Sequence, residues 1–142
     1  MTKIAIGADH GGYELKEQVV NFLQEKGYEF KDFGCFSTES VDYPVVAREV
    51  ANSVAEGNFD KGIIICGSGL GVCIVANKVK GVRATNCNDL YSAEMSRKHN
   101  DANVLTMGGR VVFKELALEI VELWLNTEFE GGRHQKRVDM IE

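Results

Sequence analysis

The chain has 142 residues, of which 44% are hydrophobic and 26% charged, and its formal net charge is −5 at pH 7. This composition is typical of one globular domain, expected to span residues 1–142, and the negative charge disfavours a nucleic-acid partner. No apolar stretch approaches membrane-spanning length and no secretion signal precedes the first strand, so we expect a cytoplasmic protein without membrane contact.

The cysteine pattern gives no sign of disulfides or metal ligands. The four cysteines are Cys35, Cys66, Cys73 and Cys87. They form no CxxC pair and show no metal-like spacing with the three histidines. We therefore expect reduced thiols, no bound metal and no cofactor.

Short apolar segments alternate with segments of helical periodicity along the chain. The expected strands are residues 4–7, 28–33, 62–66, 82–87 and 104–107. The expected helices are residues 13–26, 45–55, a helix from the glycine loop to 78, 89–99 and 113–126. Gly27 is a natural helix terminator, and Pro44, the only proline, stands where the second helix begins. Five strand–helix repeats predict an α/β fold with a parallel sheet covered on both faces.

Polar residues follow four of these strands. They are Asp9 and His10, then residues 66–71, 86–89 and 108–110. In open parallel sheets, ligands bind beyond the carboxyl ends of the strands. We therefore expect the functional site at this edge.

The segment Cys66-Gly67-Ser68-Gly69-Leu70-Gly71 follows a run of β-branched residues and carries the clearest chemical signal. Its glycines predict a tight turn with bare backbone N–H groups, and a thiol beside them is a potential base or nucleophile. A plain strand-to-helix turn and a small buried hydrophobe are the alternatives, and the second is the interpretation for Cys35, Cys73 and Cys87. Ser68 is suited to donate to an oxyanion, to cap the helix, or both.

Two histidine-containing segments admit both structural and functional interpretations. Asp9 suits an N-cap, whereas His10, followed by two glycines, suits contact with an anion or a substrate hydroxyl. His99 and Asn100 end a helix, where a protonated imidazole interacts favourably with the helix dipole; a catalytic role is the alternative.

A basic cluster at 133–137 stands out from the acidic background. If this segment is helical, Arg133 and Arg137 lie one turn apart on one face and can grip a phosphate. A solvated basic tail is the alternative. Arg110, after two glycines at a strand end, is a third candidate for the same anion.

Taken together, these segments resemble the type B ribose-5-phosphate isomerase family, which includes galactose- and allose-6-phosphate isomerases. The matching segments are GADHGG (7–12), DYP (42–44), ICGSGLG (65–71), ANK (76–78), SRKHND (96–101), GGRVV (108–112) and EGGRH (130–134). They span nearly the whole chain. The resemblance implies a three-layer, Rossmann-like α/β/α sandwich with strand order 2-1-3-5-4. It also implies a homodimer or dimer of dimers with shared active sites.

The resemblance also assigns roles for converting ribose 5-phosphate into ribulose 5-phosphate. Cys66 is the expected base, and the amides of 67–71 with Ser68 hold the enediolate oxygen. His99 opens the sugar ring and Asp9 assists at the substrate oxygens. His99 and Asn100 come from the partner subunit. The expected substrate contacts are Asp9, His10, Tyr43, Gly67, Ser68, Gly69, Leu70, Gly71, Asn100, Arg110, Arg133 and Arg137.

Two departures from the family pattern bear on the chemistry. Ser68 replaces a frequent Thr and keeps the hydroxyl, and Val72 stands where another branch carries a glutamate base, so only the thiolate branch fits. Isomerisation needs a base, an oxyanion stabiliser and a phosphate grip, but no metal. An allose- or galactose-6-phosphate isomerase and, from another class, a flavodoxin-like module binding a phosphate-bearing cofactor remain alternatives.

Overall fold

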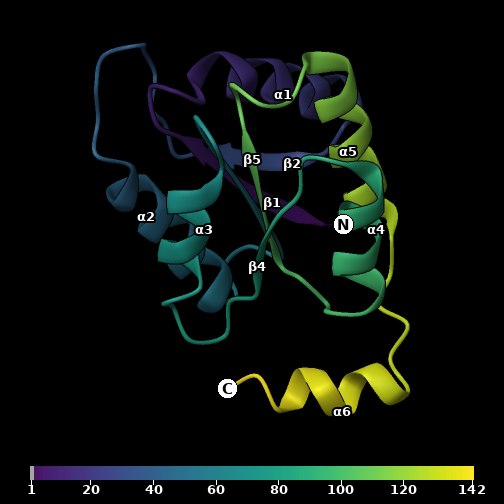
Figure 1. Ribbon diagram of the computed structural model, residues 1–142. Helices are drawn as coiled ribbons and strands as arrows, with labels where there is room; N and C mark the ends of the chain where they lie inside the picture. Colours follow the sequence, from purple (N-terminus) through teal and green to yellow (C-terminus); the bar gives the residue numbers. More distant parts are fainter. Residues whose placement is uncertain (1) are drawn as a thin grey trace.

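Residues 2–142, which the computed structural model describes, form a five-stranded parallel sheet with helices on both faces (Figure 1). The strands are β1 (Lys3–Ala8), β2 (Glu29–Asp32), β3 (Lys61–Cys66), β4 (Ala84–Asn86) and β5 (Val104–Gly108). The helices are α1 (Tyr13–Glu25), α2 (Tyr43–Ala55), α3 (Leu70–Ala76), α4 (Leu90–Lys98), α5 (Lys114–Asn126) and α6 (Arg133–Asp139). The order β2-β1-β3-β5-β4 confirms the expected fold.

Two hydrophobic cores lie on opposite faces of the sheet. The larger core packs α1, α4 and α5 against one face around the fully buried Trp124. The smaller core packs α2 and α3 against the other face. The sheet between them makes the middle of three layers, as Figure 1 shows.

Strand β3 occupies the centre of the sheet, between β1 and β5. Ile63 and Ile65 belong to the larger core and Ile64 to the smaller one, which explains why the strand is apolar throughout rather than alternating. Its register pairs Ile65 with Ala8 of β1 and Cys66 with Gly108 of β5. Three strands therefore end side by side at one edge of the sheet.

Strand β4 and helix α3 are among the elements that are shorter than the sequence pattern predicts. Strand β4 begins at Ala84 because the N–H of Arg83 bonds to the Oδ1 of Asn103, at 2.7 Å, instead of joining the ladder. Helix α3 ends at Ala76, after which the N–H of Lys78 bonds to the carbonyl of Val75 in a tighter turn. The expected bounds of 82–87 and of a helix reaching 78 were therefore too long.

The helices that follow β1, β3, β4 and β5 return the chain from the carboxyl edge of the sheet to the amino edge, as parallel strands require. Helix α4 accordingly ends, with His99 as its C-cap residue, at the edge opposite Cys66. Helix α6 lies on that same side, below the sheet in Figure 1. Among residues 2–142, none of the helices combines the length and apolarity needed to cross a bilayer.

Candidate active site

Cys66 ends the central strand and is 6% exposed. Its Sγ accepts a hydrogen bond from the backbone N–H of Gly69 at 3.1 Å. This bond requires Gly69 to turn back with φ of 83°, and a Cβ there would meet Asn86 and Met107. An N–H aimed at a sulfur stabilises a thiolate more than a neutral thiol. The loop therefore suits a sulfur that acts as a base.

Ser68 lies at the tip of the loop and is exposed. Its Oγ accepts the N–H of Leu70 at 3.2 Å, so the hydroxyl closes the turn before α3 and keeps its proton for a ligand. Both uses expected of Ser68 are thus compatible. Leu70 itself points outward, with 58% of its surface exposed.

Asp9 follows β1 and is 7% exposed. Its Oδ1 accepts the N–H groups of Gly11 at 2.9 Å and Gly12 at 3.1 Å. The N-cap of α1 is Gly12, which has no side-chain cap, so Asp9 holds the turn before the helix rather than occupying the cap position. Its other carboxylate oxygen has no hydrogen bond within residues 2–142.

His10 is turned toward the loop that precedes α2. Its Nδ1 accepts the backbone N–H of Val41 at 3.2 Å, and its Nε2 has no hydrogen bond within residues 2–142. Because Nδ1 is the acceptor, the neutral ring carries its proton on Nε2. His10 is therefore arranged as a donor.

A cavity of about 550 Å³ opens at the carboxyl edge of the sheet. It is lined by Asp9, Tyr43, Cys66, Gly67, Ser68, Gly71, Arg110 and Val111. Arg110 reaches it because its backbone N–H bonds to the carbonyl of Gly67 at 3.0 Å. His10, Gly69 and Leu70 do not line this cavity.

The remaining predicted residues lie elsewhere. His99, Asn100, Arg133 and Arg137 line a second cavity, of about 470 Å³, together with His134, Val138 and Ile141. None of these four was expected from a strand end, and within one chain they lie away from the carboxyl edge. The physical reason is the course of α4, which carries its C-terminal end to the amino edge. The helical spacing expected for Arg133 and Arg137 is confirmed, since both belong to α6.

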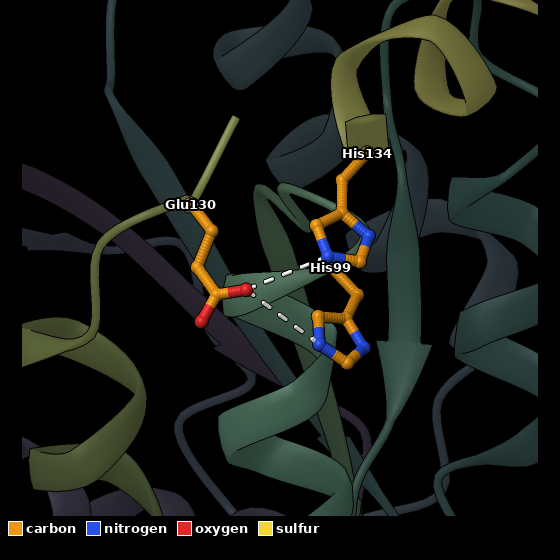
Figure 2. Close-up of side chains that lie close together, drawn as sticks. All are labelled: His99, Glu130 and His134. Carbon is orange, nitrogen blue, oxygen red and sulfur yellow. Dashed lines mark ion pairs between the residues drawn. The ribbon is translucent and has the colours of Figure 1, made fainter. Parts of the chain in front are cut away.

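His99 has two close neighbours that the sequence interpretation missed (Figure 2). Its ring stacks on that of His134, with centroids 4.2 Å apart and planes 12° apart. The Oε1 of Glu130 lies 3.8 Å from the Nε2 of His99 and 3.4 Å from the Nε2 of His134. Burial, followed by the neighbouring His99 and Arg133, lowers the pKa of His134. Glu130 and His134 are four residues apart, a helical spacing that could have revealed the pair.

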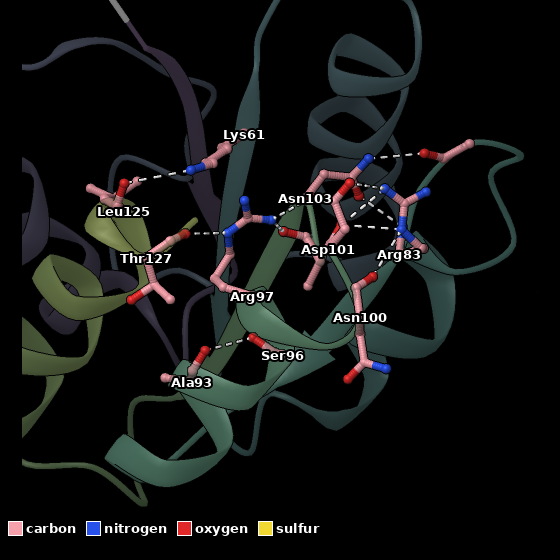
Figure 3. A network of polar contacts seen from close by, with 12 residues as sticks. Lys61, Arg83, Ala93, Ser96, Arg97, Asn100, Asp101, Asn103, Leu125 and Thr127 are labelled. Carbon is pink, nitrogen blue, oxygen red and sulfur yellow. Dashed lines mark hydrogen bonds and ion pairs between the residues drawn. The ribbon is translucent and has the colours of Figure 1, made fainter. Parts of the chain in front are cut away.

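A polar network fixes the turn that carries His99 and Asn100 (Figure 3). Arg97, 7% exposed, donates to Asp101 at 2.9 Å and to the carbonyls of Ala102 at 2.6 Å and Thr127 at 3.0 Å. Arg83 donates to the carbonyl of Asn100 at 3.2 Å. The network joins the end of α4 to the segment after α5, so hydrogen bonds brace the wall of the second cavity that His99 and Asn100 form.

The other cysteines differ from Cys66. Burial raises the pKa of both Cys73 and Cys87. Only Cys87 is buried; Cys35 and Cys73 are partly exposed, so their description as buried hydrophobes was wrong. Cys35 lies instead in an open loop, where its Sγ is 3.3 Å from the carbonyl of Ser37.

A family model described as Ribose/Galactose Isomerase matches residues 4–141. The chain belongs to this family. It is 53% identical to ribose-5-phosphate isomerase B of Escherichia coli K12, over 99% of this chain and 95% of the relative. It is 46% identical to D-erythrulose-4-phosphate isomerase of Pectobacterium atrosepticum, over 99% and 93%. The structure of Clostridium thermocellum ribose-5-phosphate isomerase B is 56% identical and superposes with a TM-score of 0.97, over 98% of this chain and 94% of that one.

Membership of the ribose/galactose isomerase family makes the chain a sugar-phosphate isomerase and disfavours the flavodoxin-like alternative. The structure also brings together one group of side chains that the sequence pattern does not connect. Within residues 2–142, facing nitrogen and oxygen atoms of His99, Glu130 and His134 all lie within 4.8 Å of one another, so side chains able to coordinate a metal are present. Sequence spacing connects only Glu130 with His134, because His99 comes from a different element.

Asp9 allows a test of its structural role in this isomerase. Asp9→Ala removes the acceptor for two backbone N–H groups and should lower the free energy of unfolding by about 1–3 kcal/mol. Asp9→Asn keeps an acceptor oxygen and should cost less. Urea denaturation of the three proteins measures both effects, and an Asp9→Ala variant as stable as the unmodified chain would contradict the assignment.

Proposed function

We propose that this chain interconverts ribose 5-phosphate and ribulose 5-phosphate, with Cys66 as the base. The observation that carries the proposal is the Sγ of Cys66, which sits at the end of β3, lines a cavity and accepts the N–H of Gly69. An aldose–ketose isomerase must remove a weakly acidic proton next to a carbonyl, and a thiolate held in this way is suited to that task.

The proton movement can be followed atom by atom. The thiolate takes the proton from C2 of the open-chain aldose, and the electron pair moves into a C1–C2 double bond as the carbonyl oxygen becomes an enediolate oxygen. Return of the proton to C1, with transfer between the two oxygens, gives the ketose. The backbone amides of 67–71 and the hydroxyl of Ser68 are the candidate donors to the developing charge.

The phosphate end of the substrate needs a cationic site remote from the reacting carbons. Arg133 and Arg137 point into the second cavity from one face of α6 and provide bidentate donors for a phosphate. His99 lies in the same cavity and is the proposed group for ring opening, with Asn100 beside it. Arg110 and His10 are proposed to contact the phosphate from the carboxyl edge.

These roles require both cavities to meet, although they lie at opposite edges of the sheet in one chain. We therefore propose a homodimer, or a dimer of dimers, in which the Cys66 cavity of one copy faces the His99 cavity of another. Exposed apolar side chains on several elements support an interface of this kind. They include Leu70, Ile74, Tyr91, Phe113, Met140 and Ile141. The exposed fractions of these side chains run from 56% for Ile141 to 83% for Phe113.

The carbon number of the preferred sugar phosphate has to be measured, because relatives of similar sequence identity are named for five-carbon and four-carbon sugar phosphates. We expect kcat/KM to be highest for ribose 5-phosphate among ribose 5-phosphate, D-erythrulose 4-phosphate, allose 6-phosphate and galactose 6-phosphate. The assay uses metal-free protein. A higher value for any other sugar phosphate would move the assignment within the family while leaving the isomerase chemistry in place.

Removal of the proposed base gives a direct test. Cys66→Ala should lower kcat by about 10²–10⁴-fold, since it removes the only thiol at the cavity while leaving the fold unchanged. Cys73→Ser is the matched control, because Cys73 lies on α3 outside the cavity, and it should keep its activity. Circular dichroism checks the fold. Near-normal turnover in Cys66→Ala would remove the thiolate from the mechanism.

Shared active sites predict recovery of activity when two defective chains are mixed. Arg137→Ala should raise KM for ribose 5-phosphate by about 10–100-fold, because a hydrogen-bonded cation is lost from the phosphate. In a mixed dimer with Cys66→Ala, one of the two sites would combine an intact Cys66 with an intact Arg137. Activity at low substrate should therefore exceed the sum of the separate variants after subunit exchange. If the activity of the mixture only equals the sum of the two separate variants, each complete site lies within one chain.

A further inference from the structure

Three side chains from separate parts of the chain converge at the end of α4. His99 is the C-cap residue of that helix, Glu130 lies in the segment after α5, and His134 lies in the first turn of α6. Figure 2 shows the carboxylate of Glu130 directed at both imidazoles. Their facing atoms all lie within 4.8 Å of one another.

We propose that His99, Glu130 and His134 form a binding site for one divalent transition-metal ion of the zinc class. Two imidazoles and one carboxylate are a common set of protein ligands for such an ion, with the fourth position left to water or a ligand. Metal–ligand bonds of about 2.0–2.2 Å in a tetrahedron place neighbouring ligand atoms roughly 3.4 Å apart. The Glu130 oxygen already lies 3.4 Å and 3.8 Å from the two imidazole nitrogens.

The backbone holds these ligands near their positions. The N–H of Glu130 bonds to the carbonyl of Lys98 at 3.1 Å, which fixes the carboxylate beside the end of α4. Arg97 holds Thr127, three residues earlier, through its carbonyl at 3.0 Å. His134 is only 8% exposed. Binding therefore costs little ordering of the chain.

One side chain must move before all three ligands can coordinate the same ion. The lone pair of an imidazole lies in the plane of its ring, and two stacked rings cannot both direct theirs at one ion. The ring of His99 must therefore tilt out of its stack on His134. The side chain of His99 is 39% exposed, compared with 9% for His134, so His99 is the ring free to turn.

The surroundings select the class of metal. Arg133 and Arg137 line the same cavity, and their positive charges oppose cations held mainly by electrostatic attraction, such as Mg²⁺ and Ca²⁺. Imidazole nitrogens form strong coordinate bonds with Zn²⁺, Co²⁺, Ni²⁺ and Cu²⁺ instead. The cavity leaves the remaining coordination position open to exchangeable ligands.

The consequence for activity rests on the proposed function. A metal bound at the Nε2 of His99 engages the imidazole that is proposed for ring opening, so the ion acts as an inhibitor rather than as a cofactor. Removing the ion with a chelator restores the free imidazole. The site would make the isomerase sensitive to free transition-metal ions.

Binding is tested on the full chain after chelator treatment, independently of activity. Titration calorimetry with Zn²⁺, and visible absorption of bound Co²⁺, should show one site per chain. Loss of an outer-shell partner alone weakens metal binding about 10–100-fold, so removal of a ligand in Glu130→Gln should weaken it by at least about 100-fold. Glu128→Gln, an exposed carboxylate two residues away, is the matched control and should bind normally.

A thiol is the main competing ligand for zinc, so Cys66→Ala should retain the calorimetric site. Zn²⁺ should also slow isomerisation of the unmodified chain, reversibly with EDTA, and slow Glu130→Gln less relative to its own metal-free rate. Absence of binding, equal affinity in both glutamate variants, or loss of the site in Cys66→Ala would each overturn the proposal. A chain that binds zinc at this cluster but has no isomerase activity would contradict the proposed function alone.

Discussion

The arrangement of this molecule depends on the requirement that parallel strands be joined by elements that run back across the sheet. Each strand delivers its last residue to one edge, and each following helix carries the chain to the opposite edge. The register of β1, β3 and β5 places Asp9, Cys66 and the glycines before Arg110 together. The same requirement takes His99 away from them at the end of α4. The same rule of chain connection therefore brings Asp9 and Cys66 together at one edge of the sheet and places His99 at the opposite edge.

The two cavities are built by different means. At the carboxyl edge, backbone groups of glycine loops approach one another closely, and the sulfur of Cys66 takes the place of a carbonyl as acceptor for Gly69. At the amino edge, long cationic side chains hold backbone carbonyls, as Arg97 does for Ala102 and Thr127. Glycines let backbone segments come close together at the first cavity, whereas the buried Arg97 braces the turn that carries His99 and Asn100 into the second. The second cavity also brings together the histidines and Glu130.

Much of the fold could be predicted from the sequence because periodicity and breakers act locally. The apolar run before Cys66 and the proline at the start of α2 marked their elements correctly. The early end of β4 could not be predicted, since it depends on Asn103 capturing the N–H of Arg83. Asp9, Cys66 and Arg110, from three strand ends, line one cavity as expected, whereas His10 and residues 86–89 do not line it. The grouping of His99 with Glu130 and His134 depends on three-dimensional folding of the tail. His99 lies so far from the other two in the sequence that no spacing pattern connects it with them. Only Glu130 and His134, four residues apart, show such a pattern.

The placement of the two cavities at opposite edges has a thermodynamic consequence. In the proposed homodimer, a sugar phosphate that bridges two copies would bind the assembled form and not the separate chains, so by mass action it would strengthen their association. Specific activity would then fall on dilution, and saturating substrate would offset the fall. Substrate supply and quaternary structure are coupled in such an enzyme without any separate regulatory element.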